Sequence, residues 1–182
     1  MDGVQASGFS GFRNRIASPA LQAVADYWQQ VRDRKPMPAW SDFAPAAISP
    51  HLKRLWVFKY DRASGEFKAR LAGNRVMMRF GKSFRGTPLK ELHPPHIFEQ
   101  CHAHLTRSVS EPAFLHCTGR LFRIGERLVE GERIALPLAS DGHHGDGILG
   151  ASDFRHTPVF GPIELIFDRM EWFSVQPGTT LS

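Results

Sequence analysis

Three arginines surround a glycine-punctuated stretch in the first half of the chain. Arg75 and Arg79 precede the segment 81–86, and Arg85 lies within it. Guanidinium groups near backbone amides bind carboxylates and phosphates, often through two parallel hydrogen bonds. The spacing therefore allows an anion-binding site. The alternative is that these long side chains extend from the surface into water.

Apolar side chains near the arginines could form the wall of a ligand pocket. Binding sites are mostly apolar with a few polar groups, and the adjacent Met77 and Met78 suit an adaptable wall. The candidate ligand-binding residues are Arg75, Met77, Arg79, Phe80, Phe84, Arg85, Leu115, Phe122 and Leu136. The alternative is an ordinary closed core that holds no ligand.

Four histidines lie just before or on one predicted helix and raise the question of haem. They are His93, His96, His102 and His104. Haem iron in many proteins is held by such a histidine. The chain's histidines are spread along its whole length, however, and no axial pair is indicated, so packing or surface roles are favoured. The sequence therefore does not identify a cofactor for this protein.

Metal binding has two further candidates. One joins Cys101 and His104, one helical turn apart, with His116 and Cys117 on a strand. Zinc ligands normally occur as closely spaced pairs on turns, and a buried free cysteine usually serves packing. The other candidate is the loop 141–147, with two histidines between two aspartates, which reads more simply as a solvated turn. We predict no metal site.

Motifs for catalysis are missing. The chain has no Gly-x-Ser-x-Gly elbow and no His-Glu-x-x-His pair, and the segment 81–83 (Gly-Lys-Ser) lacks the upstream glycine of a phosphate-binding loop. Glu91 and His93 are close in sequence, but nothing orients them as an acid–base pair. We predict that the protein is not an enzyme; a small-molecule enzyme using the same pocket is the alternative.

Composition sets the class of protein. The chain has 182 residues, of which 42% are hydrophobic and 11% aromatic, enough for one domain with a real core. The net charge of +5 is spread along the chain, which argues against a nucleic-acid interface. Two cysteines, no secretory signal and no membrane-length apolar run predict a cytoplasmic protein with reduced thiols.

Local patterns predict the elements that position these residues. Ser18-Pro19 marks the start of a helix that runs to about Arg34. A second long helix follows Pro94-Pro95, and helical spacing indicates a third over 162–173. Apolar alternation predicts strands at 52–60, 66–72, 113–122, 128–138 and 147–154.

This order predicts an α+β domain. Short links of hairpin type favour one five-stranded antiparallel sheet with helices packed on one face, plus an N-terminal helix and a C-terminal helical extension. We expect a mobile tail over residues 1–17, the domain with its N-terminal helix over 18–155, and the extension over 156–182.

Several landmarks, in this order and spacing, resemble a PAS domain of the proteobacterial single-domain PAS_5 family. They are Tyr27-Trp28, Pro36-x-Pro38-x-Trp40-x-Asp42, Phe67-x-x-Arg70-Leu71-x-Gly73, Gly81-x-x-Phe84-x-Gly86-x-x-Leu89-x-Glu91-Leu92, Glu132-x-x-x-Leu136-Pro137-Leu138 and Leu149-Gly150. The resemblance covers about residues 20–155. The sequence departs from the usual pattern in the histidine-rich loop 141–147 and after Phe154.

The resemblance implies a sensory or protein-interaction module in bacterial signalling, with a small molecule held between sheet and helices. It also implies a homodimer and a signalling partner protein, which remains unidentified. The apolar faces of 19–34 and 162–173 are the expected dimer contacts. A structural adaptor with a filled core is a further alternative.

Overall fold

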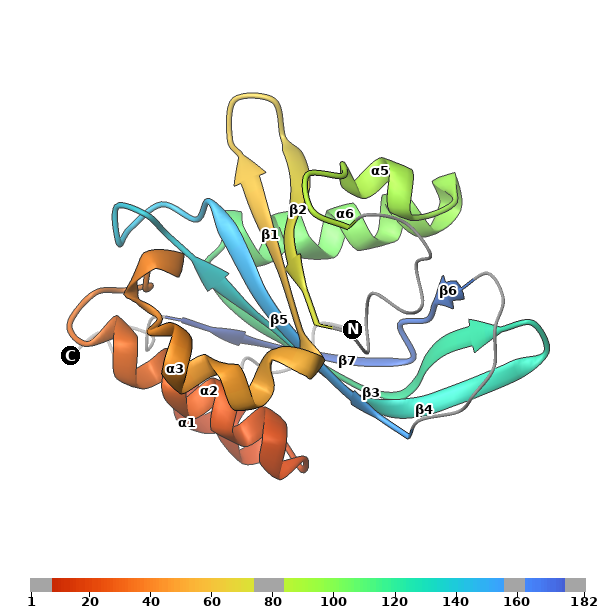
Figure 1. Cartoon of the computed structure of the whole chain (residues 1–182), viewed down its shortest axis with the longest axis horizontal. Coiled ribbons are helices and arrows are strands. Elements are labelled where there is room, and N and C mark those ends of the chain that lie inside the picture. The colour runs from red at the N-terminus through yellow and green to blue at the C-terminus, as the bar shows by residue number, and fades with distance from the viewer. Residues whose placement is uncertain (1–7, 74–83, 156–162, 176–182) are drawn as a thin grey trace, which may run out of the picture.

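A single antiparallel sheet organises the chain, which the computed structural model describes at residues 8–73, 84–155 and 163–175 (Figure 1). The strand order is β2-β1-β5-β4-β3-β6, and β7 also pairs with β3. The strands are β1 (Leu55–Asp61), β2 (Glu66–Ala72), β3 (Ala113–Ile124), β4 (Arg127–Leu138), β5 (Gly147–Phe154), β6 (Ile163–Leu165) and β7 (Arg169–Ser174). The predicted five-stranded antiparallel sheet is confirmed by the first five strands.

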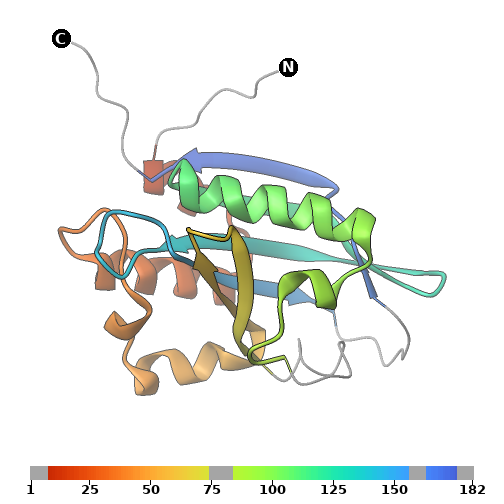
Figure 2. The same ribbon diagram turned by 90° about the horizontal axis from the view of Figure 1, so that it is seen from above.

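Helices cover both faces of the sheet rather than the one face that was expected. On one face lie α1 (Gly8–Arg15) and α2 (Pro19–Arg32), and on the other lie α5 (Leu89–Leu92) and α6 (Pro95–Ser110) (Figure 2). Short helices connect α2 to β1: η1 (Trp40–Asp42), α3 (Pro45–Ile48) and η2 (Ser49–Arg54). Two apolar clusters therefore sandwich the sheet.

The start of the chain is more ordered than its composition suggests. Residues 8–15 form α1, where a mobile tail was predicted, and Phe12 and Ile16 are almost completely buried. The Phe12 ring lies against Phe114 of β3 with a centroid distance of 4.6 Å. The apolar anchor of this segment lies on a strand a hundred residues away, so local glycine and serine content could not reveal it.

The predicted C-terminal helix is wrong. Residues 163–165 and 169–174 are strands that pair with β3 at the end of the sheet. In β7, Met170 is exposed while Phe173 is buried against α1 and the sheet. The apolar residues in a segment of only twelve residues fit both a helix and a strand pattern. The unpaired backbone N–H and C=O groups at the edge of β3 favour the strand, because they can form hydrogen bonds with it.

The predicted dimer contact on α2 also changes. Its apolar face, with Leu21, Val24, Ala25 and Trp28, is buried against the sheet, and the Trp28 indole N–H donates to the carbonyl of Pro137 at 3.0 Å. Ser18 caps the helix as expected, accepting from the N–H of Leu21. The apolar face of α2 therefore stabilises the domain itself.

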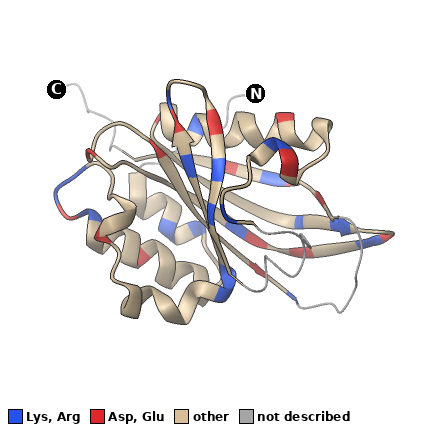
Figure 3. Cartoon of the chain, turned by 45° about the horizontal axis from the view of Figure 1, so that its top comes forward, with Lys and Arg blue, Asp and Glu red and all other residues tan. Residues whose placement is uncertain are grey.

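Charged side chains are distributed over many elements. Basic and acidic residues are both scattered over the described strands and helices (Figure 3). Several form surface ion pairs, such as Arg13 with Asp26 and Arg120 with Asp168. Among the described residues, no helix has the length and hydropathy to cross a membrane.

Candidate functional site

A cavity lies between the sheet and α6. Its walls are mostly aromatic and aliphatic, with a few polar groups, and its volume is about 70 Å³. That is well below the roughly 300–1,000 Å³ of sites for drug-sized molecules. The described lining residues are Trp56, Phe58, Phe84, His93, Cys101, His104, Leu105, Leu115, Phe122, Arg133, Ala135, Ser152, Phe154, Ile163, Leu165 and Phe167.

Three of the predicted pocket residues line this cavity: Phe84, Leu115 and Phe122. In a regular strand, Leu115 and Phe122 would point to opposite faces of the sheet, because they are an odd number of residues apart. An irregularity in the β3–β4 register between Arg120 and Phe122 allows both side chains to face the cavity. The extra residue turns Phe122 toward the cavity, where it meets Phe154 at 5.1 Å between ring centroids.

Leu136 was predicted in the pocket and is not there. It belongs to the cluster under α1 and α2, on the other face of the sheet. Ala135, which pairs with Leu115, lines the cavity instead. Side chains of a strand alternate between faces, so an error of one residue reverses the assignment.

The predicted arginine cluster is only partly visible. Arg85 is exposed and does not line the cavity. Arg75, Met77, Arg79 and Phe80 lie outside the described residues.

The cation of the cavity is Arg133 on β4, which is 6% exposed. One guanidinium nitrogen, Nη2, donates to the carbonyl of Leu121 at 3.3 Å. The guanidinium carbon lies 4.9 Å from the Phe122 ring and 5.8 Å from the Phe167 ring. Burial lowers the pKa of Arg133, and among the described residues no carboxylate lies within ion-pair distance of it.

Ser152 lies next to Arg133. The two residues are register partners on β5 and β4, and Cys117 of β3 is the partner of Arg133 on its other side. The Ser152 hydroxyl accepts from the Trp56 indole N–H at 3.1 Å. The indole lies across Gly150, where a Cβ would come within 2.1 Å of the ring. Glycine is therefore required for Trp56 to form this wall.

The other titratable groups at the cavity are neutral: His93, His104 and Cys101 line it, and Cys117 lies beside Arg133 on β3. Burial, followed by the charge of Arg133, lowers the pKa of His93 to about 4. The pKa of His104 is also lowered, mainly by burial and to a smaller extent by the positive charge of Arg107. Burial raises the pKa of Cys101 to about 12 and that of Cys117 to about 11. At pH 7 the permanent charge among these groups is therefore that of Arg133.

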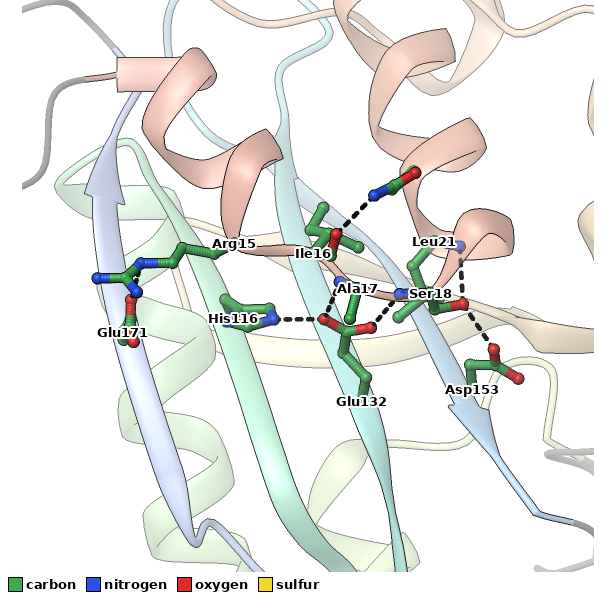
Figure 4. Close-up of polar contacts among 10 residues, drawn as sticks. Arg15, Ile16, Ala17, Ser18, Leu21, His116, Glu132, Asp153 and Glu171 are labelled. Atoms are coloured by element: carbon green, nitrogen blue, oxygen red, sulfur yellow. Dashed lines mark hydrogen bonds and ion pairs between the residues drawn. The ribbon is translucent and has the colours of Figure 1, made fainter.

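A polar node lies on the opposite face of β4, next to Arg133 in the sequence. The buried Glu132 accepts from Nε2–H of His116 at 2.6 Å, and from the backbone N–H groups of Ala17 at 2.8 Å and Ser18 at 2.7 Å (Figure 4). The Ser18 hydroxyl donates to Asp153 of β5 at 2.5 Å. These bonds fasten the junction between α1 and α2 to the sheet.

The electrostatics of Glu132 follow from these contacts. Burial by itself raises the pKa of this carboxyl, but the hydrogen bonds from His116, Ala17 and Ser18 together outweigh burial. The pKa of Glu132 is therefore lowered, and the group is a carboxylate at neutral pH. The node is intact when Glu132 is ionised.

The candidate metal and haem ligands are brought together only in part: His93, Cys101 and His104 line the cavity, and the others lie elsewhere. His116 bonds Glu132 on the face opposite to Cys101 and Cys117. His102 contacts the carbonyl of Gly65 at 2.7 Å, outside the cavity. In the part of the chain that the structure describes, no group of three or more His, Cys, Asp and Glu side chains is arranged for a metal ion.

Arg133, Ser152 and the role of Glu132 were missed by reasoning from the sequence. Glu132 was noted only as a landmark. A signal existed for Arg133: it interrupts a strand whose neighbours are almost all buried, so a charged side chain had to face the interior there. Ser152 carries no such signal, because serine occurs in cores and on surfaces alike.

Comparison with known proteins adds the family. The model of the PAS_5 family, described as a PAS domain, matches residues 16–152. No match was found among curated proteins or among solved structures. The match spans α2, β1 to β4 and most of β5, while four lining residues of the cavity, Phe154, Ile163, Leu165 and Phe167, lie beyond it. The antiparallel sheet with its helices agrees with that assignment, and the chain belongs to the PAS domain family.

Proposed function

We propose that this PAS domain is a non-enzymatic sensory module that binds a small molecule in the cavity under α6. The single observation that carries the proposal is the cavity itself, an apolar space between sheet and helix with a few polar groups pointing into it. Such a combination is the usual form of a small-molecule site. A filled core, as in the adaptor alternative, leaves no such space.

The output in this proposal follows from β4, because this one strand carries Arg133 into the cavity and Glu132 to the N-terminal helices. A ligand that shifts β4 changes the hydrogen bonds to Ala17 and Ser18. Docking of α1 and α2 would then report whether the cavity is occupied.

Assembly with another chain, either a second copy or a bacterial signalling partner, belongs to the same proposal. Support comes from β7, which pairs with β3 on one side and carries the exposed Met170. A strand edge offers N–H and C=O groups to a partner strand. Two free cysteines support a reducing, cytoplasmic location. Light scattering of the wild type and Met170→Lys measures the assembly.

Native mass spectrometry tests ligand binding. We expect the wild type to carry excess mass that is lost on denaturation. Ala135→Leu adds three carbons inside the cavity and should remove that mass, while Ala63→Leu, in the exposed β1–β2 turn, should retain it. Equal native and denatured masses, both as purified and after incubation with a metabolite extract, would contradict the proposal and favour the adaptor.

The enzyme alternative is weakened by the position of its two candidate groups. His93 lines the cavity, but Glu91 is exposed on α5 and does not. A general acid–base pair needs both groups within reach of the same substrate.

A further inference from the structure

Arg133 has few partners for a buried cation. A guanidinium has five N–H donors, and the described contacts of Arg133 comprise one hydrogen bond and two aromatic rings. Buried charges in proteins are normally paired. The described acidic side chain nearest in sequence, Glu132, points to the opposite face of the sheet.

The neighbour of Arg133 on the same face can assist an anion. Ser152 accepts a hydrogen bond from Trp56, so its own hydroxyl proton is available to donate. Arg133 and Ser152 are directly opposed on β4 and β5 and both line the cavity. A planar anion at this place would receive guanidinium and hydroxyl hydrogen bonds together.

The rest of the cavity limits the charge and size of that anion. One guanidinium balances one negative charge, whereas a phosphate dianion needs more cations or several backbone N–H groups. The aromatic walls offer contact to an apolar body. The volume of about 70 Å³ restricts that body to a few carbon atoms, since a cavity that holds one benzene ring has about twice this volume.

Given the ligand-binding function proposed above, we infer that the cavity takes a small monocarboxylate, whose carboxylate pairs with Arg133 and Ser152 and whose apolar body lies against the aromatic walls. The ion pair supplies the counter-charge that Arg133 otherwise lacks among the described residues. It also explains why a strand facing an apolar space carries an arginine.

Isothermal titration with matched pairs of probes tests this inference. Propionate and butyrate are the acids, and propionamide and butyramide have the same bodies without the charge. We expect the acids to bind at least about 30-fold more tightly than the amides, which corresponds to about 2 kcal/mol of binding free energy. The comparison uses the wild-type protein, so it does not depend on any variant folding.

Variants then assign the contact. Arg133→Gln should abolish the preference for acids, and Ser152→Ala should weaken acid binding by a smaller factor. Arg127→Gln, an exposed arginine on the same strand, is the matched control and should leave binding unchanged. Circular dichroism and a thermal melt of each variant confirm that the fold is retained.

The outcomes separate the inference from the proposed function. If acids and amides bind equally, or if Arg133→Gln retains the preference, the inference is overturned while ligand binding stands. Tighter binding of inorganic phosphate than of either acid would likewise overturn it. If none of the probes binds and native mass spectrometry finds no bound molecule, the proposed function and the inference both fail.

Discussion

Replacing Glu132 by Gln tests how strongly the N-terminal helices are fastened to the sheet. The carboxylate accepts three hydrogen bonds, from His116, Ala17 and Ser18. An amide of the same shape has one acceptor oxygen and an NH₂ group that cannot accept. At least one of the three donors must then lose its partner.

The size of the effect follows from these contacts. Glu132 is 7% exposed, so water cannot readily replace a lost partner. A hydrogen bond to a charged group contributes about 1.5–3 kcal/mol, and we expect the free energy of unfolding to fall by about 2–3 kcal/mol. For a chain of this length the melting temperature should fall by about 4–12 °C.

Urea denaturation measures the loss, and hydrogen exchange should show faster exchange at the amides of Ala17 and Ser18. Glu130→Gln, on the exposed side of the same strand, is the control and should change stability by less than about 0.5 kcal/mol. A Glu132→Gln variant as stable as this control would refute the reasoning.

The pH dependence gives an independent check. The folded-state pKa of Glu132 is lowered, so its stabilisation is present above the ordinary carboxyl pKa and disappears as the pH falls through the folded-state value. The difference between wild type and Glu132→Gln should therefore be largest at neutral pH and shrink below about pH 4.5. A constant difference down to strong acid would contradict this.

Three other expectations follow from the cavity. Because the pKa of His93 is lowered to about 4, stability should fall by about 2 kcal/mol between pH 7 and pH 5, and His93→Gln should flatten this fall in urea titrations; an unchanged slope would argue against a buried neutral histidine. Cys101 and Cys117, with pKa values raised to about 12 and about 11, should react with a disulfide reagent at pH 8 only after unfolding; rapid labelling of the native protein would show that they are accessible. Gly150→Ala places a Cβ 2.1 Å from the Trp56 ring, so we expect altered indole fluorescence and a lower melting temperature, and an unchanged melt would show that the wall rearranges freely.

The structure explains why glycine and tryptophan occupy several positions at which the sequence resembles the family. Trp28 donates to Pro137 across two elements, and Gly150 leaves space for the Trp56 ring. Gly73 lies so close to the Leu52 carbonyl that an added Cβ would be 1.7 Å from it. The spacing of these residues was visible in the sequence, but their contacts cross from one element to another and could not be inferred from spacing.

Assignments to a face of the sheet succeeded where one strand was considered by itself. In the strand predicted at 52–60, side-chain alternation places Leu55 and Val57 on one face and Trp56 and Phe58 on the other, and the two apolar clusters agree with this. Between strands the inference failed for Leu136, because relative register depends on pairing and on the irregularity in β3.

The sequence by itself determined the strands and helices of the central domain, the cap of α2 at Ser18 and the family, because these depend on local periodicity, turn chemistry and the order of landmarks. Tertiary structure alone decided that α1 packs on the sheet, that 163–165 and 169–174 form strands, and that Arg133 and Glu132 point to opposite faces. Each of these depends on partners distant in the chain, and periodicity states which residues share a face without stating what covers it.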